Sequence, residues 1–223
     1  MVFRHEIKHV ISPGDRLLLR QRLTAVMSPD PHSVNGSYHI RSLYFDTPED
    51  RALYEKLNGV SRREKFRLRY YGGDPTYIRL EKKSKLSGLC SKETAPITYE
   101  QVQQLLGGDT SFLAESPEPL HRELYAKMGQ SLLSPRTIVD YIREPFVYVP
   151  GNVRVTLDRE IRTGLGSLDF LNPDSLTVPA GEDTVILEVK WDTFLPDVIR
   201  DLVQLDSCRS QSFSKYAQCR IYG

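Results

Sequence analysis

Residues 62–71 read RREKFRLRYY, and this segment decides the fold class. Charged and large apolar side chains alternate along it, which is the pattern of a β-strand with one buried face. The turn sequence GGDP (72–75) follows, and residues 76–85 (TYIRLEKKSK) alternate in the same way. Two alternating runs joined by Gly, Asp and Pro predict an antiparallel hairpin with one apolar face and one charged face.

The same alternation recurs along the chain. Strands are expected at 3–10, 37–46, 62–71, 76–85, 89–94, 136–144, 153–160 and 184–191, with a weaker signal at 161–170. The side chains on the charged faces are Arg4, Glu6 and Lys8; Lys65, Arg67 and Arg69; Arg79, Glu81, Lys83 and Lys85; Tyr141 and Arg143; Arg154, Thr156 and Asp158; and Glu188 and Lys190. One such face alone is typical of an ordinary sheet with one side in water. Six of them favour a sheet that curls with its charged face inward.

Helical signals lie between the strands and at the end of the chain. Ser12 followed by Pro13 and Asp15 predicts a capped helix start. Helices are expected over 13–27, 49–57, 99–106 and 118–129, and residues 196–222 have mostly helical character. Because strands do not alternate regularly with helices, the pattern predicts an α+β fold with about eight antiparallel strands rather than βαβ units. We expect residues 1–223 to form a single domain.

Composition limits the classes of partner. Lys and Arg number 30 against 29 Asp and Glu, so the formal net charge is only +1. A general nucleic-acid binder usually has a clear basic excess, so no nucleic-acid partner is expected. The three cysteines have no metal-ligand spacing, and an odd number without a signal peptide favours a reducing cytoplasm. No apolar run approaches the length of a membrane span. We expect a cytoplasmic protein, and peripheral association with the inner face of a membrane stays open.

An inward face of this composition has a specific chemical use. Cations packed together are unfavourable unless a counter-charge is present, and a triphosphate or polyphosphate supplies one. Arginine engages phosphate oxygens bidentately, and lysine acts as a point charge. A few carboxylates among the cations would hold Mg²⁺ or Mn²⁺. Phosphoryl transfer needs mainly positioning and charge stabilisation, which such a lining provides.

The order of the motifs resembles the VTC domain, the polyphosphate polymerase domain of the vacuolar transporter chaperone family, and in particular its stand-alone bacterial members. The resembling segments are RHEIK (4–8), SLYFDTP (42–48), KFRLRYYG (65–72), RLEKKSK (79–85), DYIREPF (140–146), VRVTLDREI (153–161), ILEVK (186–190) and SFSKY (212–216). This family is similar to the CYTH proteins and belongs to the triphosphate tunnel metalloenzymes. The resemblance therefore implies an eight-stranded antiparallel closed β-barrel, a triphosphate tunnel, with helices packed outside.

The resemblance also implies roles for individual residues. Phosphate binding is carried over to Lys8, Arg67, Arg69, Lys83, Lys92, Arg143, Arg154, Lys190, Ser214 and Lys215, among which Arg67, Arg69, Lys83, Arg143 and Arg154 are the expected catalytic residues. Glu188 is the expected main ligand of a divalent metal, Mn²⁺ or Mg²⁺, with Glu6 and Glu81 as helpers. The chain departs from the family pattern at three places. Arg4 stands where CYTH relatives have a glutamate, Glu93 and Thr94 follow Lys92 where the family often has another basic residue, and Ser212 stands where eukaryotic polymerases have a lysine.

Three functions remain open at this point. The resemblance favours an enzyme that transfers the γ-phosphate of ATP to a growing polyphosphate chain, with a membrane protein as a possible partner. A metal-dependent triphosphatase in the same tunnel would instead need a general base to activate water, for which Glu6, Glu81 and Asp158 are candidates. A module that only binds polyphosphate or another polyanion would need neither a base nor Glu188.

Overall fold

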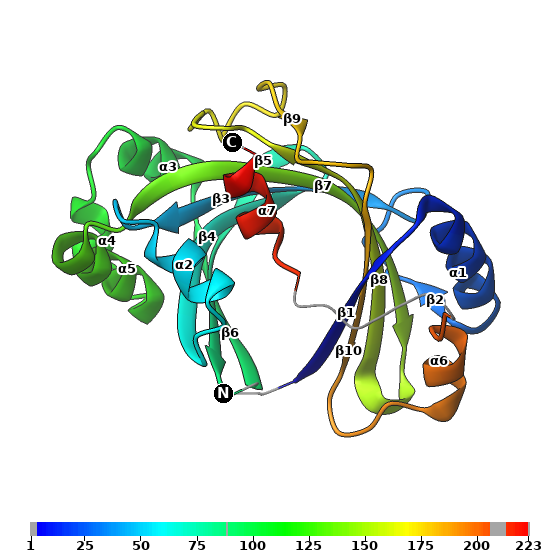
Figure 1. The fold of residues 1–223 in the computed structure, drawn as a ribbon. Coiled ribbons are helices and arrows are strands. Elements are labelled where there is room, and N and C mark those ends of the chain that lie inside the picture. The colour runs from blue at the N-terminus through cyan, green and yellow to red at the C-terminus, as the bar shows by residue number, and fades with distance from the viewer. Residues whose placement is uncertain (1–3, 88, 206–212, 223) are drawn as a thin grey trace.

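One strongly curled antiparallel sheet dominates the protein (Figure 1). The computed structural model describes residues 4–87, 89–205 and 213–222. The strand order is β1-β10-β8-β7-β3-β4-β5-β6, with the short strands β2 beside β7 and β9 beside β8. The strands are β1 (His5–Ile11), β2 (Ser28–Pro29), β3 (Tyr38–Asp46), β4 (Arg62–Tyr71), β5 (Asp74–Leu86), β6 (Leu89–Ile97), β7 (Ser134–Tyr148), β8 (Val153–Thr163), β9 (Val178–Pro179) and β10 (Val185–Trp191).

Six of the α-helices were expected from the sequence in outline, and α4 was not. The helices in the described part of the chain are α1 (Pro13–Val26), α2 (Arg51–Leu57), α3 (Tyr99–Leu106), α4 (Ser111–Glu115), α5 (Pro119–Ser131), α6 (Asp197–Leu202) and α7 (Lys215–Ile221). The predicted capping box at Ser12 and Asp15 is present, and Thr98 with Gln101 forms a second one at α3. None of the described helices is both long and apolar enough to cross a membrane.

The expectation of a closed barrel was wrong, and the sheet is an open half-barrel. Its edge strands β1 and β6 meet at one isolated bridge, between Arg4 and Cys90. These strands are antiparallel there, and β6 begins at Leu89. The residues of β1 that follow Arg4 therefore extend past the start of β6, where β6 has no residues left to pair with them. From the bridge onward β1 runs away from β6, and the sheet stays open between these two strands (Figure 1).

Two further expectations need correction. Residues 161–170 do not form a separate strand, because β8 continues to Thr163 and a turn follows at Gly164. The end of the chain is not continuously helical: α6 stops at Leu202, α7 starts at Lys215, and residues 206–212 lie outside the described part. Pro196 lies directly before α6, where its missing N–H costs no helical hydrogen bond.

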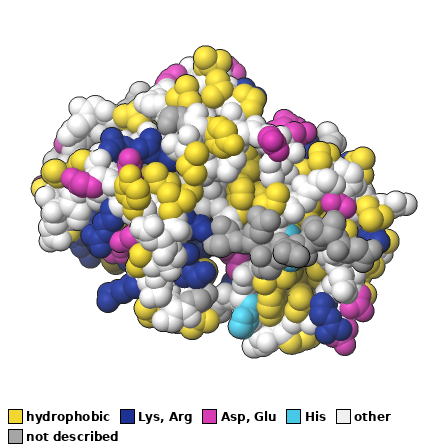
Figure 2. Space-filling model, viewed as in Figure 1, with side chains coloured by type: hydrophobic (Ala, Val, Ile, Leu, Met, Phe, Trp, Pro, Cys, Tyr) yellow, Lys and Arg dark blue, Asp and Glu magenta, His cyan; other side chains and the backbone are white. Residues whose placement is uncertain are grey.

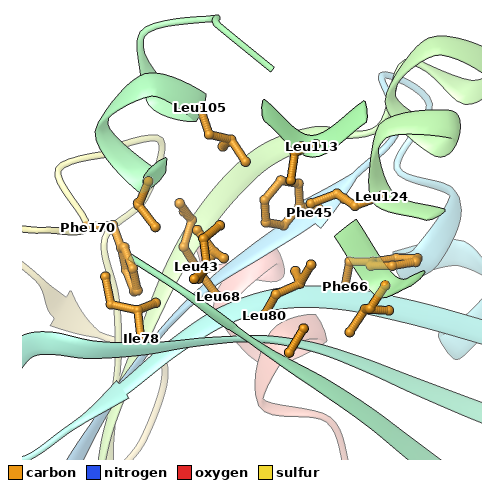
Figure 3. Close-up of a cluster of buried hydrophobic side chains, with 14 of the residues drawn as sticks. Leu43, Phe45, Phe66, Leu68, Ile78, Leu80, Leu105, Leu113, Leu124 and Phe170 are labelled. Atoms are coloured by element: carbon orange, nitrogen blue, oxygen red, sulfur yellow. The ribbon is translucent and has the colours of Figure 1, made fainter. Parts of the chain in front are cut away.

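Apolar side chains on the convex face of the sheet pack under two groups of helices. One cluster joins Leu43, Phe66 and Leu80 of the sheet to Leu105 of α3 and Leu124 of α5 (Figure 3). A second joins the outer residues of β8 and β10 to α1 and α6. Because side chains alternate along a strand, this packing turns the charged positions of the same strands to the concave face.

Helix α7 lies on the concave side of the sheet, which makes it different from the outer helices (Figure 1). Tyr216 and Cys219 of α7 belong to an apolar cluster with Tyr44 and Tyr141, two residues of the inner face. The ring of Tyr216 stacks on that of Tyr44 with centroids 5.0 Å apart. The Tyr216 hydroxyl donates to the buried carboxylate of Asp46. The C-terminal helix therefore fills part of the concavity and carries its N-terminal residues into it.

Candidate functional site

The charged rows of the strands meet on the concave face, and ion pairs connect strands that are far apart in the sequence. Glu6 of β1 and Glu188 of β10 form the centre of one group, which we call the Glu6–Glu188 cluster. Lys8 Nζ lies 3.0 Å from Glu6 and 3.3 Å from Glu188, and Lys190 Nζ lies 3.6 Å and 3.1 Å from the same two carboxylates. Lys83 of β5 reaches across to Glu6 at 2.8 Å. Two carboxylates thus share three lysines.

These lysines keep both carboxylates ionised. Burial alone and the nearby Glu188 would raise the pKa of Glu6, yet Lys8, Lys83 and Lys190 outweigh them and lower it to about 2. For Glu188, burial opposes ionisation too, but Lys190, Lys8 and Arg143 hold its pKa well below the usual range. Burial lowers the pKa of Lys190 to about 8, against the opposing pull of the two carboxylates.

Asp158 of β8 extends the cluster toward α7. Arg143 of β7 grips the buried Asp158 carboxylate with Nε and Nη2, both at 2.7 Å, and its Nη2 also lies 3.3 Å from Glu188. Lys215, the first residue of α7, lies 2.6 Å from Asp158. Burial would raise the pKa of Asp158, but Arg143 and Lys215 lower it to about 2. Lys215 also lies over the ring of Tyr141.

Glu81 of β5 forms a second group, which we call the Glu81 cluster. Arg67 Nη2 lies 2.6 Å from Glu81 and Arg69 Nη1 lies 3.9 Å from it, and Lys92 of β6 pairs with the same carboxylate. Burial opposes the ionisation of Glu81, but the three cations lower its pKa strongly. The tyrosine hydroxyls of β3 and β7 contact the arginines, since Arg67 donates to Tyr44 at 2.7 Å and Arg69 donates to Tyr141 at 3.1 Å.

Arg154 and Ser214 have separate surroundings. Arg154 Nη2 donates to Asp30 at 2.8 Å and to the hydroxyl of Tyr38 at 2.5 Å, and its cross-strand neighbour is Lys190. Ser214 caps α7 by accepting from the Ala217 amide, and it also accepts from Lys65 Nζ at 3.0 Å. The Ser214 hydroxyl therefore lies among the cations of the inner face.

The carboxylates of the site form a pair rather than a metal-binding triad. Among the residues that the structure describes, no three His, Cys, Asp or Glu side chains come together as a metal-binding group. Glu81 belongs to a different set of cations from Glu6 and Glu188. The oxygens of Glu6 and Glu188 are the donors that Mg²⁺ and Mn²⁺ prefer, and both groups are ionised. The pair fits a metal whose remaining ligands come from phosphate and water.

The structure brings the predicted residues onto one face, most of them in the two clusters, with Arg154 and Ser214 outside them. It also adds residues that the sequence analysis did not assign to the site, namely Tyr38, Tyr44, Asp30 and Lys65. The parity of β3 would have identified the two tyrosines, because they lie on the face of that strand that meets Arg67 and Arg143 in the neighbouring strands. No signal in the sequence connects Asp30, which follows β2, to Arg154. In Figure 2, Lys and Arg side chains border a hollow near the middle of the view.

Two solved structures have a similar fold. A putative adenylate cyclase from Bacillus halodurans has a similar structure, with a TM-score of 0.51 and 12% identity over 85% of this chain and 80% of that one. The PH1012 protein from Pyrococcus horikoshii matches with a TM-score of 0.50 and 12% identity over 97% of this chain and 99% of that one. These likenesses establish the fold. No curated protein matches the sequence. The VTC domain family matches residues 3–222, and the chain therefore belongs to that family.

Proposed function

We propose that this protein is a polyphosphate polymerase, which transfers the γ-phosphate of ATP to the end of a growing polyphosphate chain held on the concave face. The observation that carries the proposal is the excess of cations over carboxylates there. The cations are Lys8, Lys65, Arg67, Arg69, Lys83, Lys92, Arg143, Arg154, Lys190 and Lys215, and the carboxylates are Glu6, Asp30, Glu81, Asp158 and Glu188. A chain of phosphates supplies the missing negative charge.

The arginines and lysines carry most of the mechanism. Arg67 and Arg143 place guanidinium charge beside the phosphate chain, and this charge offsets the repulsion between the two anions that react. Lys8 and Lys83 add positive charge where the leaving oxygen becomes negative. A divalent ion on Glu6 and Glu188 would supply further charge neutralisation of the phosphates.

The acid–base properties of the carboxylates favour a phosphate acceptor over water. Hydrolysis needs a group that removes a proton from water. Glu6 and Asp158 have pKa values of about 2, since neighbouring cations outweigh the effect of burial, and the pKa of Glu81 is strongly lowered as well. Such carboxylates are poor bases at neutral pH. A terminal phosphate is already largely ionised there and attacks without a base.

The direct test is chain growth by the purified protein. We expect ATP and Mn²⁺ to yield acid-insoluble polyphosphate and ADP in step, and Arg67→Ala to abolish both products. Arg200→Ala is the matched control, because Arg200 lies on α6, is 61% exposed and pairs only with Asp197 and Asp201 of its own helix among the described residues. Release of free phosphate without polymer would support the triphosphatase instead, and intact protein inactive with Mn²⁺ and with Mg²⁺ would refute both enzymes.

A further inference from the structure

Lys65 differs from the other cations that we propose to bind the phosphate chain. It lies on β4, two residues before Arg67, and its side chain is half-buried. Its Nζ donates to the Ser214 hydroxyl at 3.0 Å and lies 5.4 Å from the centre of the Tyr216 ring. No carboxylate of the described chain lies within ion-pair distance of Lys65. Each of the other nine cations proposed to bind the phosphate chain lies within ion-pair distance of a carboxylate.

The groups around Lys65 are themselves basic. Lys83 is its cross-strand neighbour on β5, and Lys8 of β1 approaches from the other edge of the sheet. Lys56 of α2 and Arg63 of β4 add further positive charge, while the start of α7 brings the hydroxyl of its N-cap Ser214 and the ring of Tyr216 next to Lys65. An ammonium group in this position is desolvated and surrounded by like charge. Both effects favour loss of its proton.

We propose that Lys65 contacts a phosphate oxygen of the bound triphosphate or polyphosphate chain and takes up a proton when that phosphate arrives, an inference that rests on the proposed function. The geometry supports this, because Lys65 lies on the same face of β4 as Arg67 and beside Lys83, two residues expected to bind the chain. A phosphate there supplies the counter-charge that the protein itself does not provide.

The protonation of Lys65 explains why binding should be linked to pH. Burial, followed by Lys8 and Lys83, lowers the pKa of Lys65 to about 7. At pH 7.5 a large share of the free protein therefore carries a neutral amine at this position. A phosphate anion in contact with Lys65 favours the charged form and raises that pKa. Binding then draws a proton from the buffer, and affinity falls as the pH rises through 7 to 9.

Calorimetric titration with inorganic tripolyphosphate in two buffers of different ionisation enthalpy measures this proton. We expect the wild type at pH 7.5 to take up more protons on binding than Lys65→Arg, whose guanidinium is always charged. The ligand and Lys190 also change protonation in both proteins, so the comparison uses the difference in proton uptake between them, which reports on residue 65. Lys65→Met should bind about tenfold to a hundredfold more weakly, as expected when a charged hydrogen bond is lost.

The outcomes separate this inference from the proposed function. Equal proton uptake by the wild type and Lys65→Arg, or unchanged affinity of Lys65→Met, would overturn the role of Lys65 while the phosphate site stands. Failure of the wild type to bind tripolyphosphate would overturn both. Should Lys65→Met fold poorly, as seen by circular dichroism, the comparison of the wild type with Lys65→Arg still decides the question.

Discussion

The two halves of the concave face use their carboxylates differently. In the Glu81 cluster, one carboxylate faces Arg67, Arg69 and Lys92. In the other half, Glu6, Glu188 and Asp158 share Lys8, Lys83, Lys190, Arg143 and Lys215. The first half therefore has the larger excess of positive charge for each carboxylate, and the second brings two carboxylates onto the same lysines.

This difference suggests a division of labour. A surface with three cations around one carboxylate is suited to holding the oxygens of a phosphate chain. A pair of carboxylates that are both ionised is suited to a divalent cation, which would take the place of a lysine ammonium between them. We therefore expect Glu188 to affect turnover and Glu81 to affect stability and binding, and the following substitutions test that contrast.

Glu188→Gln should have the largest effect. Removal of the charge weakens the hold on a divalent ion while the cations that bind phosphate remain. We expect polymer formation to fall by about 10²–10³-fold, the usual cost of losing a group that stabilises charge in the transition state. Rates with ATP and Mn²⁺ measure this, and tripolyphosphate binding without metal should stay the same or become tighter. A Glu188→Gln variant that keeps the full rate of polymer formation would show that Glu188 is not a metal ligand. A wild-type protein that binds tripolyphosphate but forms no polymer would favour the binding module.

Glu81→Gln should mainly cost stability. The side chain of Glu81 is 1% exposed, and its removal leaves Arg67, Arg69 and Lys92 facing one another. Breaking a buried ion pair from one side typically costs about 3–5 kcal/mol of unfolding free energy. Urea unfolding measures the loss, and tripolyphosphate should restore much of it by supplying the missing charge. Asp197→Asn, in a pair that is 61% and 79% exposed, is the control with little effect. Equal losses of unfolding free energy in Glu81→Gln and Asp197→Asn would contradict the stabilising role of Glu81.

The residues of the concave face were largely predictable, because alternation along a strand decides which side chains share a face. Arg67, Arg69 and Glu188 lie where the pattern of their own strands put them. Which charges meet is a different matter, since it depends on the register between strands that are far apart in the sequence. Lys83 reaching Glu6 requires the sheet to curl until β5 approaches β1. Nothing local in either strand encodes that distance.

The helix at the end of the chain shows the same limit. A helical tendency was visible there, but its position on the concave side follows from long-range contacts. Tyr216 reaches Asp46, and Lys215 reaches Asp158. The open seam was also missed, because the resemblance implied closure. Only the register of the Arg4–Cys90 bridge shows that β1 passes the end of β6.

Asp158→Asn should reduce the sensitivity of the fold to acid. The pKa of Asp158 is lowered from 3.8 to about 2 in the folded protein, where Arg143 and Lys215 outweigh burial. A lowered carboxylate pKa gives stability that is fully present above about pH 5 and is lost as the pH falls toward 2. The full contribution is about 2 kcal/mol, of which about half is lost by pH 3. Unfolding at pH 6 and pH 3 should therefore show a smaller decline for the variant than for the wild type, and an identical decline would refute this role.

Lys92→Met should have the smallest effect, although Lys92 pairs with the same carboxylate as Arg67. Its side chain is 48% exposed on the edge strand β6, so water and salt screen its charge. We expect tripolyphosphate affinity to fall by no more than about fivefold, equivalent to about 1 kcal/mol. Lys8→Met is the matched change on the other edge strand, where the lysine is 21% exposed and separates Glu6 from Glu188. Lys8→Met should lower tripolyphosphate affinity more than Lys92→Met does, because it removes a positive charge that both Glu6 and Glu188 contact. A larger loss for Lys92 would mean that the bound chain runs along the open edge rather than across the floor of the half-barrel.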